Sequence, residues 1–383
     1  MLDNLSKRFF SKLLNKIISL PINLIITSLI PRALSVADYG NFNFITQYFT
    51  SITTFFDGGT STALFTKLSK SKKEPFLIKY YMILTFYISL LIIFSVIIIF
   101  YFNLESLVWI GQSKLIIFLG LIYGLLYWFH QVFQKIIDSL GLTISGEKAL
   151  FNKNILALFL ILLLFYFEIL NLKFLFIYHF FLFLFLIFFW VRILIKNNIL
   201  IFPKKTISIE IKKKYNKEFF YFSFPLFTTT VIVLFFSFFD RWMLQSFGGS
   251  EQQAYYSLSF KISTLCFIFT SSISPIFQKE ITNAFANNNM LEVKSLFLKF
   301  VPMFFFIATS ICLFFAINSN KISLLIGGEK FMEATSSVAI MSIYPIHQTL
   351  GHFNSSVFFA SDKTMIYRNI SIFIVFLGSI STY

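Results

Sequence analysis

The stretch YYMILTFYISLLIIFSVIIIFYF, residues 80–102, contains no charged side chain, and only two serines and one threonine interrupt its apolar and aromatic residues. About 20 mostly apolar residues suffice for an α-helix to cross the hydrocarbon core of a bilayer. Comparable runs recur along the whole chain. We therefore interpret this stretch as a membrane-spanning helix and predict an all-α fold, a polytopic bundle of transmembrane helices.

The composition supports this interpretation. Of 383 residues, 57% are hydrophobic and 13% are charged, and phenylalanine alone contributes 57. Soluble domains carry roughly 25% charged residues, and a soluble fold of this length cannot bury so much apolar surface. A soluble enzyme, a nucleic-acid-binding domain and a disordered chain are therefore excluded. Cys266 and Cys312 each lie in an apolar run, which implies neither a disulfide framework nor a metal site.

Charge clusters and Gly, Asn or Pro breaks divide the chain into eleven predicted spans. They cover residues 14–34, 41–66, 77–102, 115–137, 149–170, 173–195, 219–247, 252–278, 295–317, 332–360 and 366–383. Most of the 32 lysines and arginines flank these spans on one side of the membrane, with the largest group in residues 192–217. Since cytoplasmic loops are enriched in Lys and Arg, we predict a multi-pass protein of the bacterial inner membrane with a cytoplasmic N-terminus.

The basic connection 196–218 is the longest polar segment, and it separates two predicted lobes. The N-terminal lobe comprises residues 1–217 and spans one to six, and the C-terminal lobe comprises residues 218–383 and spans seven to eleven. The segments PRALSVADYGNFNFITQYFTSI (31–52) and DRWMLQSFGGSEQQAYYSLSFKIST (240–264) share a weak pattern, as expected for pseudo-symmetric repeats. Two six-helix lobes would need a twelfth span, so the second lobe is expected to be truncated.

Polar residues recur on one face of several predicted spans. Span two presents such a face along its whole length, span eight a shorter one, and span ten a third; the candidate lining residues are Asn43, Thr50, Thr54, Ser257, Thr264, Gln348 and His352. Polar atoms are costly in lipid, so a complete stripe favours a wet cavity. The alternative is that each hydroxyl bonds its own backbone or a neighbouring helix.

Five of the charged residues within or at the ends of these spans are candidate site residues. Asp57 precedes paired glycines that permit a helix break, and it is either a packing hydrogen-bond acceptor or a proton or cation site. Asp240 and Arg241 point about 100° apart on a helix and do not simply pair. Arg241 and Arg32 could instead be interface anchors. Lys261 is too deep for easy snorkelling, which favours a wet cavity around it.

No nucleotide-binding, metalloprotease or nucleophile motif is present, and the histidines show no metal-ligand spacing. We therefore expect a non-enzymatic protein with no cofactor and no metal site. A pump of this kind would draw its energy from an ion gradient or from the gradient of its substrate.

Two segments resemble a known family. IPRALSVADYGNFNFITQYFTSITTFFDGGTSTAL (30–64) resembles the opening of bacterial polysaccharide-unit flippases, and FFDRWMLQSFGGSEQQAYYSLSFKIS (238–263) resembles their seventh-to-eighth span junction. The matching positions are Arg32, Leu34, Asp38, Tyr39, Gly40, Asp57, Gly58, Asp240, Arg241, Tyr255 or Tyr256, Ser257 and Lys261. The chain departs from this family at its C-terminus, where the family continues to a twelfth span or beyond.

The resemblance implies a Wzx-type O-antigen flippase of the multidrug/oligosaccharidyl-lipid/polysaccharide (MOP) transporter superfamily. Such a protein moves lipid-linked oligosaccharide, carried on undecaprenyl pyrophosphate, across the bilayer by alternating access. Arg32, Arg241 and Lys261 would then attract the headgroup, and Asp57 and Asp240 would serve ion coupling, to H⁺ or Na⁺, or gating. We expect a monomer that works alone or with polysaccharide-assembly proteins and binds no nucleic acid.

Two other functions compete with this interpretation. A multidrug or peptidoglycan-lipid exporter of the same superfamily would share the architecture, although a drug exporter more readily pairs an acidic cation site with an aromatic cavity. A membrane-embedded polysaccharide polymerase ranks lower, because such enzymes carry a large outer loop and no comparably long outer loop is predicted here.

Overall fold

The computed structural model describes residues 5–70, 75–199, 207–267, 287–361 and 363–381, together with single residues between 270 and 285. Residues 200–206 of the predicted linker and most of the end of the predicted span 252–278 lie outside the described residues. The described residues form helices, turns and bends without a strand. The predicted all-α class is therefore confirmed.

The chain divides into two compact units, residues 1–250 and 251–383. The predicted lobe boundary at residue 217 rests on the basic connection 196–218 and on a weak repeat, whereas this division rests on packing. The helix that contains residue 217 belongs to the first unit, so the two divisions differ. The lobes remain a prediction.

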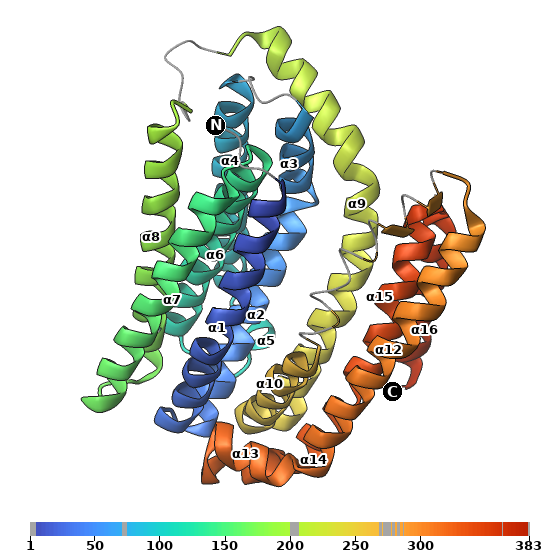
Figure 1. The fold of residues 1–383 in the computed structure, drawn as a ribbon. Coiled ribbons are helices and arrows are strands. Elements are labelled where there is room, and N and C mark those ends of the chain that lie inside the picture. Colours follow the sequence, from blue (N-terminus) through green and yellow to red (C-terminus); the bar gives the residue numbers. More distant parts are fainter. Residues whose placement is uncertain are drawn as a thin grey trace. The chain divides into compact units, whose positions relative to one another are not determined.

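The described part of the first unit contains nine α-helices and a short π-helix. Helix α2 is its centre, because it contacts α1, α4, α6, α8 and α9, while α1 packs on α7 and α6 on α8 (Figure 1). The bounds are α1 Leu5–Ala33, α2 Val36–Asp57, α3 Thr60–Lys70, α4 Pro75–Tyr101, α5 Glu105–Val108, α6 Lys114–Ser139, α7 Thr143–Tyr166, α8 Leu172–Lys196, α9 Ile209–Met243 and the π-helix η1 Leu244–Gly248.

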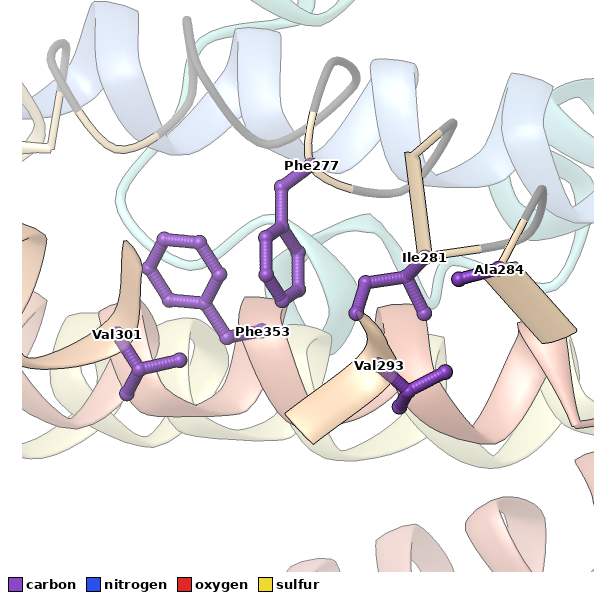
Figure 2. Close-up of a cluster of buried hydrophobic side chains, with 6 residues drawn as sticks. All are labelled: Phe277, Ile281, Ala284, Val293, Val301 and Phe353. Atoms are coloured by element: carbon purple, nitrogen blue, oxygen red, sulfur yellow. The ribbon is translucent and has the colours of Figure 1, made fainter. Parts of the chain in front are cut away.

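The second unit is built around α12, which contacts α13, α14 and α15. Its elements are α10 Gly249–Cys266, which begins at the boundary, α12 Met290–Ile317, α13 Ser319–Gly327, the 3-10 helix η2 Glu329–Ala334, α14 Thr335–Met341, α15 Tyr344–Ala360 and α16 Thr364–Ser381. A buried apolar cluster holds it together, in which the rings of Phe277 and Phe353 meet edge to face at 4.7 Å beside Val293 and Val301 (Figure 2).

Six helices in the described part of the chain are long and apolar enough to cross a membrane. They are Phe10–Ala33, Phe76–Tyr101, Lys114–Ser139, Thr143–Tyr166, Leu172–Lys196 and Met290–Ile317. Each coincides with a predicted span. The predicted break between spans five and six is present, because Asn171 caps α8 by accepting from the Phe174 N–H at 3.1 Å. The other five predicted spans include residues that the structure does not describe or are not among these six helices, and they stay predictions.

Two segments differ from the expected elements. The predicted span 41–66 is broken at Gly58 and Gly59, and α9 begins at Ile209, inside the predicted linker. Ser208 caps the start of α9, and Tyr215 and Phe219 pack against the Tyr80 ring of α4 at 5.2 and 5.4 Å. These aromatic contacts explain why a lysine-rich segment is helical rather than an extended linker.

Candidate functional site

The candidate site forms at the break between α2 and α3. Helix α2 ends at Asp57, and Gly58 and Gly59 both have positive φ, at 51° and 84°. Glycine adopts this left-handed conformation without steric cost, which makes the paired glycines the local cause of the break. A Cβ at Gly58 would also lie 3.1 Å from the Phe227 ring of α9.

Helix α6 reaches this break because it packs very closely along α2. Gly124 lies so near α2 that an added Cβ would stand 2.7 Å from the Phe49 Cβ and 3.0 Å from the Phe49 backbone C and O. On α6, Trp128 follows Gly124 by four residues, and on α2, Asp57 follows Phe49 by eight. Residues four apart lie on the same face of a helix, so Trp128 and Asp57 lie on the two faces that meet at Gly124 and Phe49. Gly120 and Gly124 thus allow α6 to pack closely on α2.

Asp57 lies 7% exposed and is surrounded by hydrogen-bond donors. Its Oδ1 accepts from the Tyr81 hydroxyl at 3.0 Å, the Thr60 hydroxyl at 3.1 Å and the Trp128 indole N–H at 3.2 Å. The Ser61 backbone N–H donates to Oδ1 at 3.2 Å, and the Ser61 hydroxyl donates to Oδ2 at 2.8 Å. A buried carboxylate needs such donors, because an uncompensated buried charge is very costly.

A single hydroxyl group bridges this carboxylate and a nearby cation. The Lys135 ammonium of α6 donates to the Ser61 hydroxyl at 2.5 Å and to the Thr62 hydroxyl at 3.4 Å. The Ser61 hydroxyl therefore links Lys135 to Asp57. An ionised carboxylate only accepts hydrogen bonds, whereas a protonated one carries a hydrogen of its own. A change in the charge of Asp57 would consequently alter its contacts with three helices.

Sequence reasoning found Asp57 and missed its partners. In the sequence, Lys135 is one of the basic residues that predict the orientation in the membrane, and nothing marks it as a site residue. Tyr81 and Trp128 resemble the other aromatic residues of the apolar spans. The spacing Gly120, Gly124, Trp128 was the available signal, since it places an indole N–H on the face that packs on α2.

The other predicted site residues of the first unit lie elsewhere. Arg32 is exposed at the end of α1, Asp240 is exposed near the end of α9, and Arg241 beside it is half-buried. The polar face of α2 is bonded within its own helix. Asn43 donates to the Tyr39 carbonyl at 2.6 Å, and Thr50 and Thr54 donate to the Thr46 and Thr50 carbonyls at 2.8 Å each.

The remaining predicted site residues belong to the second unit. On α10, Ser257 is buried, Lys261 is half-buried and Thr264 donates to the Lys261 carbonyl at 2.7 Å. On α15, Gln348 donates to the Tyr344 hydroxyl, and the His352 ring packs on Phe267 at 4.8 Å. The hydrogen bonds of Thr264 and Gln348 fit the simpler packing interpretation, and the role of these residues in lining a cavity stays a prediction.

A second polar cluster, the Asn41 clasp, joins Asn41 of α2, Gln112, Gln245 of η1 and Ser250. The Asn41 Oδ1 accepts from the Gln112 amide and from the Ser250 hydroxyl, each at 2.6 Å, and the Gln245 amide donates to Ser250 at 3.1 Å. Single-turn π-helices occur frequently at functional sites. The clasp links α2 to Gln245 and Ser250, which lie on either side of Gly249 in the sequence. The φ of 71° and ψ of −175° at Gly249 are essentially restricted to glycine.

No group of three or more His, Cys, Asp or Glu side chains that could hold a metal ion occurs among the described residues. The chemistry of the described site is therefore that of one carboxylate, its hydroxyl and indole donors, and a nearby ammonium group.

Comparison with solved structures identifies the fold. The chain is similar to an inward-facing multidrug resistance MATE family transporter of the MOP superfamily, with a TM-score of 0.73 and 15% identity over 95% of this chain and 84% of that chain. It is also similar to the lipid II flippase MurJ in an inward closed conformation, with a TM-score of 0.64 and 18% identity over 90% of this chain and 75% of that one.

A third similar structure is the Vibrio cholerae MATE transporter VcmN in the bent form, with a TM-score of 0.59 and 15% identity over 97% of this chain and 87% of that chain. No protein of curated function matches the sequence. The family model described as "Polysaccharide biosynthesis protein" matches residues 5–279, well over half of the 383 residues. The chain is thus a multi-pass membrane protein with the fold of the MOP superfamily, and it belongs to the polysaccharide biosynthesis protein family.

Proposed function

We propose that this protein flips lipid-linked oligosaccharide units, carried on undecaprenyl pyrophosphate, across the bacterial cytoplasmic membrane during O-antigen or surface polysaccharide synthesis. The family match over residues 5–279 carries this proposal. The fold supports it, because one similar structure is the lipid II flippase MurJ. The protein works by alternating access, with its N-terminus in the cytoplasm, as a monomer or with polysaccharide-assembly proteins.

Asp57 is the proposed coupling residue. It lies where α2 ends, it is buried, and its five donor contacts come from α3, α4 and α6. Binding of H⁺ or Na⁺ there would neutralise the carboxylate and weaken the hydrogen bonds that depend on its charge, since bonds to charged groups are about twice as strong as neutral ones. The ion gradient would in this way change how α3 is held to α2. Asp240, exposed near the end of α9, is the proposed gating carboxylate.

Arg32, Arg241 and Lys261 are the proposed contacts of the pyrophosphate headgroup. Guanidinium groups bind phosphate oxygens in a bidentate way, and lysine binds them as a compact point charge. The polar residues Asn43, Thr50, Thr54, Ser257, Thr264, Gln348 and His352 would line the path of the glycan, whose hydroxyls need exchangeable rather than fixed hydrogen bonds. These assignments rest on helical phase and family resemblance.

Complementation tests the proposal. The chain is expressed in a bacterium that lacks its own O-unit flippase but makes the matching glycan, and surface polysaccharide is stained. Wild type and the exposed-carboxylate control Glu329→Gln should restore staining, whereas Asp57→Asn should not. Equal membrane levels of all three proteins, measured by immunoblot, are required for the comparison. Full activity of Asp57→Asn would refute the coupling role, and no staining by the wild type at normal levels would refute the flippase assignment.

A multidrug exporter is the second candidate. It is favoured by the TM-score of 0.73 with a multidrug resistance transporter, which exceeds the 0.64 with the lipid II flippase. Drug exclusion in an exporter-deficient strain separates the two functions. Resistance to cationic drugs without restored polysaccharide would support the exporter, and the reverse result would support the flippase.

A further inference from the structure

A cavity of about 420 Å³ opens between α4 and the first turns of α9, near the start of both helices. Both helices belong to the same compact unit and contact each other directly. The cavity has its own lining, separate from Asp57 and from every other predicted site residue. Its lining residues are Lys79, Tyr80, Ile83, Leu84, Tyr87, Ile207, Lys212 and Asn216.

One end of the cavity is cationic. Lys79 comes from α4 and Lys212 from the first turn of α9, and the described lining residues include no carboxylate. Glu218, two turns along α9, is bound by Lys67 of α3 and lies 4.0 Å from Lys214. This carboxylate is thereby directed toward other lysines. The described lining therefore carries the charges of two lysines, which suits an anion.

Neutral polar groups add specificity to this end. The Tyr80 hydroxyl donates to the Asn216 Oδ1 at 2.6 Å. The bond fixes the Asn216 side chain with its oxygen toward Tyr80, so that its amide nitrogen faces the other way. Two ammonium groups and an amide N–H₂ are donors, and phosphate oxygens are strong acceptors.

The other end of the cavity is apolar. Ile83, Leu84 and Tyr87 continue the same face of α4 by one and two turns, and Ile83 and Tyr87 are 37% and 54% exposed. A soluble anion would gain nothing from such a wall, whereas an acyl chain would. The arrangement has the polarity of a phospholipid, with cations at the head and apolar side chains along the tail.

We propose that this cavity binds an anionic glycerophospholipid, with its phosphate between Lys79 and Lys212 and an acyl chain along Ile83 and Tyr87. The lysine-rich flank of the cavity lies on the predicted cytoplasmic side, so the lipid comes from the inner leaflet. The bound lipid ties the start of α9 to α4. The site goes beyond the proposed transport function, and its occupancy can be measured without transport.

Native mass spectrometry of the detergent-purified full chain tests the proposal. The protein is titrated with phosphatidylglycerol and, separately, with phosphatidylcholine, and the first bound lipid is quantified. Wild type should prefer phosphatidylglycerol, and the double variant Lys79→Gln/Lys212→Gln should bind it about 30-fold more weakly, since each lysine near the surface contributes about 1 kcal/mol. The single variant Lys212→Gln, on an exposed position, should lose about fivefold.

The matched control is Lys213→Gln/Lys217→Gln, which removes the same charge from the same helix outside the cavity lining. It should bind phosphatidylglycerol within about twofold of wild type. Equal weakening of both double variants would show diffuse surface attraction and overturn the proposal, as would a wild type that does not distinguish the two lipids. Displacement of the lipid by inorganic phosphate at equal concentration would assign the site to a soluble anion and overturn the lipid assignment.

Discussion

The close approach of α2 and α6 at Gly124 makes a measurable prediction for Gly124→Ala. The added Cβ would stand 2.7 Å from the Phe49 Cβ, whereas ordinary contacts begin at 3.4 Å, so the helices must separate by about 0.7 Å. The neighbouring atoms are a backbone carbonyl and a Cβ, which cannot move aside as a side-chain tip can. Overpacking costs about 1–3 kcal/mol, and we take about 3 kcal/mol because fixed atoms are involved.

The alanine also brings a gain, because glycine in a helix interior is about 1 kcal/mol less favourable than alanine. The expected net loss is therefore about 2 kcal/mol in the free energy of unfolding. Gly351→Ala is the matched control, because that helical glycine has no atom within 4 Å of an added Cβ. The control should leave stability unchanged or raise it by up to about 1 kcal/mol.

The assay is reversible unfolding in mixed micelles with increasing sodium dodecyl sulfate, followed by tryptophan fluorescence. Gly124→Ala should unfold at a lower mole fraction of the denaturing detergent, and Gly351→Ala should not. If the two variants are equally stable, α2 and α6 do not approach at Gly124. The register that places Trp128 against Asp57 would then be wrong as well.

Two further predictions use the same assay. Trp128→Phe removes an indole donor from the buried Asp57 carboxylate and should lower the free energy of unfolding by about 1.5–3 kcal/mol. The control Trp242→Phe removes an indole that donates to a neutral carbonyl and should lower it by about 0.5–1.5 kcal/mol. Equal losses would indicate that the Asp57 side chain is not charged. Gly249→Ala should cost about 1–3 kcal/mol through backbone strain alone, because an added Cβ at Gly249 meets nothing within 4 Å. A neutral Gly249→Ala would show that the φ of 71° is not needed for folding.

The fold was predictable in outline because apolar length is a local property of the chain. Helix α4, Pro75–Tyr101, nearly coincides with the predicted span 77–102. The glycine pair after Asp57 permitted a break, although the predicted span 41–66 continued through it. The start of α9 was not predictable in this way. Its lysines indicate a solvated linker, and only the Tyr215 and Phe219 contacts with α4 make the segment helical.

The site was predictable only in part, for a related reason. Hydrophobic and polar periodicity gives the face on which a residue lies within its own helix, and it identified Asp57. It does not give the register between two helices, which depends on packing. The pairing of Lys135 with Ser61 and of Trp128 with Asp57 follows from the Gly124 contact, and that contact is a property of the folded chain.

The dual role of Asp57 has a mechanical consequence. The residue is the last of α2, and its side chain also accepts the Ser61 N–H in the first turn of α3. The two helices cannot be bent apart without straining bonds to the same carboxylate. The stiffness of the junction between α2 and α3 therefore depends on the charge of the Asp57 carboxylate. Both α2 and α3 also pack on α6 and on α9, so a change in the angle at Gly58 and Gly59 would be passed to both neighbouring helices.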